Sequence, residues 1–328
     1  MQSRCRLFVL WMVLFFAGFT GTAALAEELK PVRFLPAWIP QSQFAGFYVA
    51  EDMGFYTEAG LAVEILQGGP ERPVSQYLGR GEVDFAALFL SQAIELRAAG
   101  VSVVNLAQLI QKSTQLLVAH ADSGIEGPED LDGRKVAVWP DFIAQPRALF
   151  RKYDVEPIIV EQGASMGVFL RGGVDAASAM RYNEYQALYL SGFEPDEFVV
   201  IELGAHSVGF PEDGIYALEQ TFESDPDRAR AFVEASLRGW EHAFAHPEEA
   251  IDSVMARVRA AGIISNRAHQ TRMLEVLREV YFDADGRREP VVLSRENFDF
   301  VVEAMIQSGD LSEPLDYTEF HRRVMSDD

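Results

Sequence analysis

Short apolar segments alternate with amphipathic segments along most of this chain, and the alternation runs twice. In the first run, the segments with strand-like patterning are residues 32–35, 61–66, 83–87 and 101–106, and those with helical patterning are residues 45–53, 74–80 and 91–99. After Gly124 the strand-like segments are residues 135–138, 157–160, 174–179 and 198–202. Strands that alternate with helices of this length indicate parallel sheets covered on both faces. The sequence therefore predicts two α/β units.

The remainder of the chain, from Glu219 onward, has helical patterning. Asp225 followed by Pro226 predicts a helix start, because a side-chain acceptor stands at the N-cap and proline in the first turn. An order of α/β, α/β and helical tail suits one lobe built from both ends of the chain and a second lobe inserted between them. The lobes that we expect are residues 27–118 with 205–328, and residues 119–204, with crossings near 115–120 and 203–214. Ligands of such sheets bind beyond the carboxyl ends of strands and between domains, so we expect the site in the groove between the lobes.

The first 26 residues have the features of a cleavable signal peptide. Arg4 and Arg6 precede an apolar run at residues 7–19, and the small residues of Ala24-Leu25-Ala26 follow it. The alternative is an N-terminal membrane anchor, for which the apolar run is short. We therefore expect an exported, periplasmic protein. Cleavage would remove Cys5, the one cysteine of the chain, and with it disulfides, thiolate metal sites and cysteine nucleophiles.

Charge and motifs exclude several classes of function. The formal net charge of −22 disfavours binding to nucleic acid or to an anionic membrane, since both require a positive patch. The chain has no His-Glu-x-x-His motif, no glycine-rich phosphate loop and no convincing Ser/His/Asp set. His242 and His246 share a helix face at a spacing that a metal site could use, but without a further ligand nearby a surface pair is favoured. We predict no catalytic residue, no metal and no cofactor.

Motifs spread over nearly the whole chain after residue 27 carry a family resemblance. The longest is Trp-Ile-Pro-Gln-Ser-Gln-Phe-Ala-Gly-Phe-Tyr-Val-Ala at residues 38–50. The others are Gly-Phe-Tyr at 54–56, Gly-Glu-Val-Asp-Phe at 81–85, Pro-Glu-Asp-Leu-Asp-Gly at 128–133, Gly-Val-Asp-Ala at 173–176, Tyr-Asn-Glu-Tyr at 182–185, Pro-Glu-Asp-Gly at 211–214 and Ser-Leu-Arg-Gly-Trp at 236–240. Their order and spacing resemble a family that includes periplasmic binders of thiamine-pyrimidine precursors and the fungal enzyme that makes the same pyrimidine.

The resemblance implies a fold and a function. It implies a type II periplasmic-binding-protein fold, in which two α/β lobes joined by a two-strand hinge close on a ligand. It also implies a monomer that captures a small planar heterocycle, similar to a thiamine-pyrimidine precursor, and delivers it to an ABC permease and its ATPase.

The chain departs from the family pattern at two places. Pyrimidine binders of the family usually carry Asp immediately before the first-strand Trp, where this chain has Ala37. They also carry an Asn-rich stretch ending in His, where this chain has Gln41, Gln43 and Phe44. The fungal enzyme relies on a cysteine-rich motif and an active-site His, so the loss of Cys5 disfavours that activity.

Candidate ligand-binding residues of the first lobe follow its strands. Trp38 can stack on a flat ring or pack beneath the adjacent helix. Gln41 and Gln43 can read the edge of a heterocycle or cap the helix that follows them. We expect one aromatic side chain among Phe44, Phe47 and Tyr48 to face the cleft, and Phe44 and Tyr48 are our candidates. The last two candidates of this lobe, at a helix start on the cleft edge, are Ser91, which an N-cap role would also explain, and Gln92.

The second lobe and the second crossing supply the remaining candidates. Trp139 and Phe142 could form the opposite wall of an aromatic sandwich, or be core residues. Glu184 could accept hydrogen bonds from a ligand and replace the carboxylate missing at Ala37, or simply favour a helix start. The remaining candidates are Tyr182 and Asn183, which precede it, and Glu212 and Asp213 on the crossing, which could meet the ligand or hold the hinge.

Three functions share these features. A transport binding protein requires an export signal, two lobes and an aromatic cleft, and the sequence offers all three. An enzyme of pyrimidine metabolism on the same fold would require a nucleophile, a metal cluster or a perturbed acid–base pair. A ligand sensor that docks on a membrane receptor would have the same cleft, and the neighbouring genes would distinguish it from an importer component.

Overall fold

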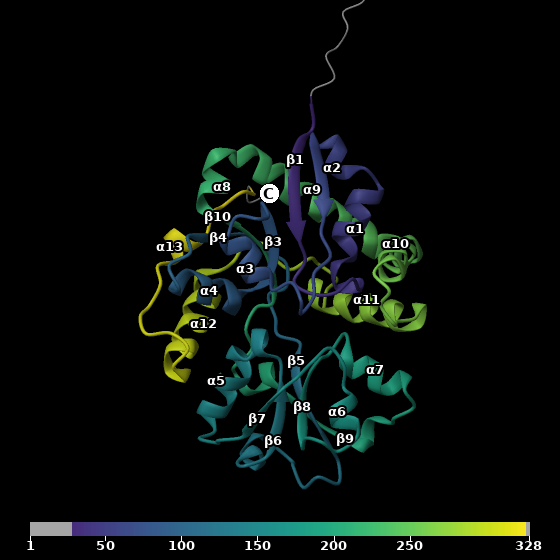
Figure 1. Ribbon diagram of the computed structural model, residues 1–328, viewed down its shortest axis with the longest axis vertical. Helices are drawn as coiled ribbons and strands as arrows, with labels where there is room; N and C mark the ends of the chain where they lie inside the picture. The colour runs from purple at the N-terminus through teal and green to yellow at the C-terminus, as the bar shows by residue number, and fades with distance from the viewer. Residues whose placement is uncertain (1–27, 326–328) are drawn as a thin grey trace, which may run out of the picture.

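The computed structural model describes residues 28–325 and consists of two α/β lobes, drawn one above the other in Figure 1. The predicted signal peptide at residues 1–26 lies outside the described residues. Within residues 28–325, no helix combines the length and the apolar character that crossing a membrane requires. The two lobes and their mixed sheets agree with the predicted fold class.

The sheet of the first lobe has five strands in the order β2-β1-β3-β10-β4. They are β1 (Lys30–Leu35), β2 (Leu61–Ile65), β3 (Phe85–Phe89), β4 (Val103–Gln108) and β10 (Asp213–Leu218). Strand β1 pairs parallel with β2 and β3, whereas β10 runs antiparallel between β3 and β4. The strand that returns from the second lobe is therefore inserted into the first sheet.

The sheet of the second lobe repeats this plan in the order β7-β6-β8-β5-β9. Its strands are β5 (Gln115–His120), β6 (Lys135–Val138), β7 (Ile158–Glu161), β8 (Ala176–Met180) and β9 (Phe198–Glu202). Here β6 pairs parallel with β7 and β8, and β5 runs antiparallel between β8 and β9. In each lobe the antiparallel strand is the first one after a crossing.

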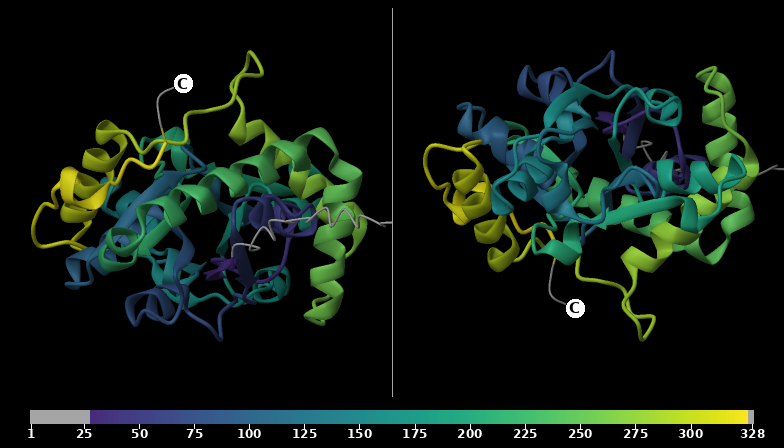
Figure 2. Two further views of the ribbon diagram at one scale, coloured as in Figure 1. Left: turned by 90° about the horizontal axis from the view of Figure 1, so that it is seen from above. Right: turned by 90° about the horizontal axis from the view of Figure 1, so that it is seen from below.

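Helices cover both sheets. The first lobe has η1 (Ser42–Phe44), α1 (Ala45–Asp52), α2 (Phe55–Glu58), α3 (Val74–Gly79) and α4 (Leu90–Ala98), and from the end of the chain α8 (Glu219–Ser224), α9 (Pro226–Ala245), α10 (Pro247–Ala260), α11 (Arg267–Tyr281), α12 (Arg295–Ser308) and α13 (Tyr317–Phe320). The second lobe has η2 (Pro128–Leu131), η3 (Pro140–Phe142), α5 (Ala144–Lys152), α6 (Gly167–Leu170), α7 (Glu184–Leu190) and η4 (Pro195–Glu197), and η5 (Leu203–His206) begins the second crossing. Viewed from above and below, α10 and the yellow C-terminal helices lie at opposite edges of the molecule (Figure 2).

Helix α9 fixes the position of α1, and thereby of the loop that precedes it. Asp225 accepts a hydrogen bond from the backbone N–H of Arg228 at 3.0 Å, which confirms the predicted helix start. A Cβ atom on Gly239 would lie 2.0 Å from the carbonyl oxygen of Gly46, so only glycine allows the two helices to approach this closely. The loop at residues 36–41, which connects β1 to η1, contacts the second lobe where Asn183 donates a hydrogen bond to Gln41 at 3.2 Å.

Two segments connect the lobes, residues 109–114 and 203–212. The first crossing was expected near residues 115–120, but these residues form the complete strand β5 of the second sheet, so the connection lies earlier. The buried carboxylate of Glu212 accepts hydrogen bonds from the backbone N–H and the hydroxyl of Thr114, which tie the two crossings together. The division into residues 27–118 with 205–328 and residues 119–204 stays a proposal.

Candidate functional site

The carboxyl ends of β1, β3, β6 and β8 meet where the lobes touch, and their side chains enclose a small cavity that we call the slot. The slot is lined by Trp38, Gln41, Gln43, Phe89, Trp139, Phe142, Met180, Tyr182, Asn183 and Glu184. Eight of these side chains are sequence candidates, and the structure brings them together from both lobes. Phe89 and Met180 were not predicted, since each is the last residue of a strand that we had expected to end earlier.

The ring of Phe142 packs against aromatic rings of the first lobe in the slot. It comes from η3 in the second lobe, and its centroid lies 4.7 Å from that of Phe89 and 5.8 Å from that of Trp38, both in the first lobe. Trp139 lies 6.2 Å away at nearly a right angle, and its indole N–H donates to the carbonyl of Gly163 at 3.0 Å. The space left between these rings is ≈ 20 Å³, about enough for one water molecule.

The polar edge of the slot is a continuous series of hydrogen bonds. Gln43 Nε2 donates to Asp213 Oδ2 at 2.8 Å, and Gln41 Nε2 donates to Gln43 Oε1 at 2.6 Å. Asn183 Nδ2 donates to Gln41 Oε1 at 3.2 Å and to Glu184 Oε1 at 2.7 Å. The series starts at β10, passes through the loop after β1 and ends on α7, so it crosses from one lobe to the other.

Three buried carboxyl groups lie around this edge. Burial raises the pKa of Glu184 to about 7, that of Asp213 to about 7 and that of Glu212 to about 8. Tyr182 is also buried, and its pKa is raised well above the usual value first by burial and then by these three carboxyl groups. No lysine or arginine is among the side chains that line the slot. The environment thus favours a neutral or hydrogen-bond-donating ligand edge over an anionic one.

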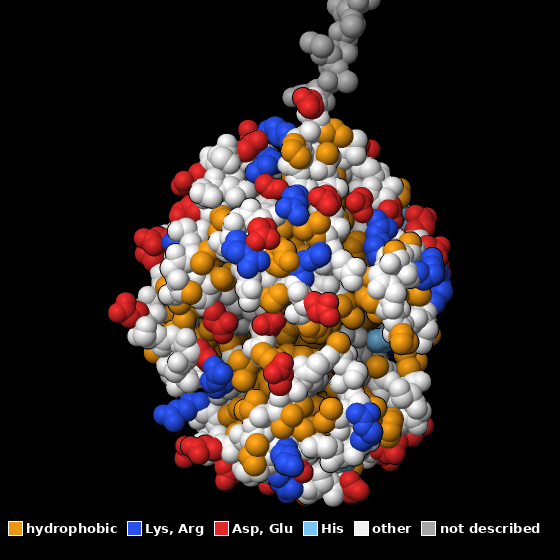
Figure 3. Space-filling model, viewed as in Figure 1, with side chains coloured by type: hydrophobic (Ala, Val, Ile, Leu, Met, Phe, Trp, Pro, Cys, Tyr) orange, Lys and Arg blue, Asp and Glu red, His pale blue; other side chains and the backbone are white. Residues whose placement is uncertain are grey.

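A wider chamber adjoins the slot and opens to the surface. The chamber has a volume of ≈ 340 Å³ and shares Trp38, Gln41, Asn183 and Glu184 with the slot. Its other walls come from the loop before α11 and from α6 and α7, so it also spans both lobes. Figure 3 shows hydrophobic side chains gathered along the line where the lobes meet. The slot and the chamber together form one cleft.

Several sequence candidates lie outside the slot. Phe44 and Tyr48 are buried in the core of the first lobe, where Arg257 stacks over the Tyr48 ring. Helix α4 begins at Leu90, one residue earlier than expected, and Gln92 Oε1 accepts from the backbone N–H of Phe89 at 3.0 Å. The N-cap role considered for Ser91 is therefore wrong. Glu212 and Asp213 do not line the slot either, although Asp213 contacts it through Gln43.

The two histidines with metal-like spacing pair with each other at the surface. The rings of His242 and His246 are stacked 4.1 Å apart, and His242 Nε2 lies 3.1 Å from Glu249 Oε2. Within residues 28–325, no group of three or more histidine, cysteine or acidic side chains is arranged to hold a metal ion.

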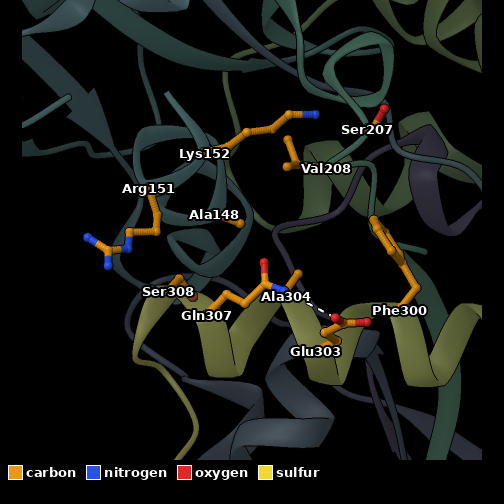
Figure 4. Close-up of a pocket in the computed structure, with 10 residues that line it drawn as sticks. All are labelled: Ala148, Arg151, Lys152, Ser207, Val208, Phe300, Glu303, Ala304, Gln307 and Ser308. Atoms are coloured by element: carbon orange, nitrogen blue, oxygen red, sulfur yellow. Dashed lines mark hydrogen bonds between the residues drawn. The ribbon is translucent and has the colours of Figure 1, made fainter. Parts of the chain in front are cut away.

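A larger groove of ≈ 700 Å³ lies on one flank of the molecule, shown in Figure 4. Its walls are α5, the second crossing and the exposed face of α12, where Gln307 donates to Glu303 at 3.1 Å. None of the sequence candidates lines it, and no strand ends there. We therefore place the candidate site in the smaller interlobe cleft, where strand ends and aromatic rings converge.

Comparisons with known proteins identify the family to which this chain is similar. A family model described as NMT1/THI5 like matches residues 41–250. The chain is 24% identical over 290 residues to a formylaminopyrimidine-binding protein of Halalkalibacterium halodurans, covering 85% of this chain and 86% of that protein. It is 27% identical over 250 residues to the riboflavin-binding protein RibY of Chloroflexus aurantiacus, covering 70% of this chain and 68% of that protein.

Two further similarities bear on the fold and on activity. The alkanesulfonate-binding protein SsuA of Xanthomonas axonopodis pv. citri superposes with a TM-score of 0.66 at 14% identity, covering 91% of this chain and all of that chain, which supports the fold alone. A 4-amino-5-hydroxymethyl-2-methylpyrimidine phosphate synthase of Legionella pneumophila is 27% identical over 119 residues, covering 36% of this chain and 38% of the enzyme. Similarity to the binding proteins is therefore more than twice as long as similarity to this synthase.

Proposed function

Since the chain belongs to the NMT1/THI5-like family, we propose that it is the exported solute-binding protein of an ABC importer and that its ligand is a small flat nitrogen heterocycle. Our first choice of ligand class is an aminopyrimidine, and a flavin is the second. The partners are then a membrane permease and its ATPase. The export signal at residues 1–26 and the periplasmic location are part of the same proposal.

The observation that carries the proposal is the meeting of aromatic rings from both lobes beside an amide edge. Trp38 and Phe89 face Trp139 and Phe142 across the slot, so both faces of a flat ligand would contact rings. Such rings contribute apolar area and favourable ring geometry but do not select one heterocycle over another. The choice between heterocycles is therefore made by the amide side chains of the polar edge, which carry both donors and acceptors.

Ligand capture requires the lobes to separate. Offset stacking places ring centroids at least about 4.5 Å apart, so a ligand between two protein rings needs about 9 Å between them. The centroids of Trp38 and Phe142 are 5.8 Å apart, and the free space is ≈ 20 Å³. Because only two segments cross between the lobes within residues 28–325, a hinge motion there can open the cleft.

The slot is not built for covalent chemistry. None of the ten side chains that line it is a serine, threonine, cysteine, histidine or lysine. Its titratable groups are Tyr182, whose pKa burial raises well above the usual value, and Glu184, whose pKa burial raises to about 7. A carboxyl group with no nucleophile among the other side chains that line the slot favours binding over turnover there.

Isothermal titration calorimetry and thermal unfolding of the mature protein test the proposal. The panel is 4-amino-5-hydroxymethyl-2-methylpyrimidine, formylaminopyrimidine and riboflavin, with MOPS as a non-aromatic control that is known to bind a protein of the same fold. We expect one aromatic compound to bind, and at 100 times its Kd it should stabilise the protein by about 2.7 kcal/mol. Binding of MOPS alone would contradict the proposal. Chemical conversion of a bound compound, detected as a change in its mass, would contradict it as well.

A further inference from the structure

We propose that Asp213 is a positioning residue that sets the direction of the hydrogen-bond series across the cleft. The site thereby selects a ligand that presents an amino group over one that presents an oxo group at the same position. The proposal rests on the proposed function, because it assigns the specificity of the same slot. Asp213 acts through Gln43, since its own side chain does not line the slot.

The series has a direction because its first member can only accept. An ionised carboxylate has no hydrogen to donate, so Asp213 requires the NH₂ end of Gln43 to face it. The oxygen of Gln43 then faces Gln41 and takes the NH₂ of that amide. The oxygen of Gln41 in turn faces Asn183 and takes one of its two N–H groups. One carboxylate thus orients three amides in succession.

At pH 8, above the pKa of about 7 to which burial raises Glu184, Asn183 and Glu184 present acceptors only at the far end of the series. Asn183 uses one N–H on Gln41 and the other on Glu184 Oε1, so what remains is its carbonyl oxygen. Glu184 offers carboxylate oxygens, one of which also accepts from the backbone N–H of Met180 at 2.9 Å. A ligand group that contacts these two side chains must therefore be a donor, as an exocyclic amino group is and an oxo group is not.

Reversal of the series would remove this selection. If the first residue could donate, Gln43 would turn its oxygen toward it, and Gln41 would direct its NH₂ at the oxygen of Asn183. Asn183 would then need only one N–H for Glu184, and its second N–H would point into the slot, where an oxo group could accept it. An asparagine at position 213 permits both directions, whereas an ionised aspartate permits one.

A purely structural role explains Asp213 poorly. The side chain is 2% exposed, and its Oδ1 atom has no hydrogen-bond partner in the part of the chain that the structure describes. A buried carboxylate with a single hydrogen bond destabilises a fold, and burial raises the pKa of this group to about 7. An asparagine of the same shape would fill the same space without burying a charge, so the carboxylate is better explained by what it imposes on Gln43.

The test compares two ligands that differ in this one group. The dissociation constants of 4-amino-5-hydroxymethyl-2-methylpyrimidine and of its 4-oxo counterpart are measured by calorimetry at pH 8, where Asp213 is mostly ionised. We expect the wild-type protein to prefer the amino compound by at least about tenfold and Asp213→Asn to reduce the preference to within about threefold. Partial unfolding weakens both ligands equally, so a loss of folded protein does not change their ratio.

Two further variants keep the result interpretable. Gln43→Leu interrupts the series after Asp213 and should lower the ratio in the same way, even if Asp213→Asn does not fold. Asp84→Asn is the matched control. Like Asp213, Asp84 accepts a hydrogen bond through one carboxylate oxygen, here from the backbone N–H of Arg33 at 2.8 Å. It precedes the start of β3, whereas Phe89, which lines the slot, is at the other end of that strand. The ratio of this variant should equal that of the wild type.

The outcomes separate the inference from the function. A wild-type ratio that survives both Asp213→Asn and Gln43→Leu overturns the role of Asp213 and leaves the proposed binding function intact. Failure of the wild-type protein to bind either pyrimidine overturns the aminopyrimidine assignment together with this inference.

Discussion

Raising the pH from about 5 to about 8 should lower the free energy of unfolding of this protein. Glu184, Glu212 and Asp213 are buried at the contact between the lobes, and burial raises the pKa of each to about 7 or 8. In the unfolded chain these groups titrate near pH 4, so between pH 4 and 8 the folded state retains protons that the unfolded state has lost. Stability contributed by such groups is complete below the unfolded pKa and is lost as the pH rises through the folded pKa.

The magnitude follows from the shift at Glu212. One pKa unit corresponds to about 1.4 kcal/mol, so a rise from 4.5 to about 8 corresponds to a loss on the order of 4 kcal/mol across the window. The contributions of Asp213 and Glu184 do not simply add, because all three carboxyl groups surround Tyr182 and influence one another. For a chain of this size, 4 kcal/mol corresponds to a decrease in Tm of roughly 5–10 °C.

Thermal unfolding followed by circular dichroism at pH 5, 6, 7 and 8, at constant ionic strength and without ligand, measures this slope. The Glu212→Gln variant cannot ionise yet can still accept from Thr114, so its Tm should depend less on pH than that of the wild type. Glu202→Gln, at the exposed end of β9, is the control and should retain the wild-type slope. A Tm that is constant or rises from pH 5 to 8, or an unchanged slope in Glu212→Gln, would refute the reasoning.

Two further predictions concern the site and the fold. Trp38→Ala and Glu184→Gln should each raise the Kd of the flat ligand by about tenfold in calorimetry without unfolding the protein, and unchanged affinity in both would remove these residues from the site. Gly239→Ala should lower the free energy of unfolding in urea by about 3 kcal/mol, because the added methyl group would overlap the carbonyl of Gly46. Gly163→Ala is its control, since no heavy atom lies within 4 Å of the added Cβ, and an equal effect there would contradict the packing argument.

The fold could be predicted because its signals are periodic and local. Alternation of strand and helix patterns, their restart after Gly124 and the helical tail are all visible within short windows of sequence, and the two sheets follow them. The order of strands is less local, since β10 lies between β3 and β4 although it follows them by more than a hundred residues. The first crossing was placed too late in the chain because the sequence of β5 does not show which of the two sheets this strand joins.

The site could be predicted only as far as strand ends could be located. Trp38, Trp139 and Glu184 follow strands whose ends were placed nearly correctly, and all three line the slot. Phe89 was missed because β3 extends two residues beyond the expected end at Ala87, which places this ring at the cleft.

The roles of Gln41 and Gln43 could not be settled from the sequence. Helix capping and reading of a ligand edge are both local interpretations, and the structure shows neither side chain capping a helix. Gln43 instead donates to Asp213, which is 170 positions away in the chain. Pairing over such a distance depends on the return of β10 to the first sheet, which no local pattern reveals.

The position at which this chain departs from the family pattern bears on the proposed role of the buried carboxyl groups around the slot. Where pyrimidine binders of the family usually have an aspartate, Ala37 is buried and carries no polar group. An acceptor is nevertheless required wherever a ligand presents an amino group to a site closed from water, because an unpaired donor there costs binding energy. In the proposed function Glu184 would supply that acceptor from the opposite lobe, and in the proposed role Asp213 would direct the intervening amides toward the same end. Since Glu184 and Gln41 lie on different lobes, the complete edge exists only when the lobes are closed, so selection of the ligand and closure of the cleft are one event.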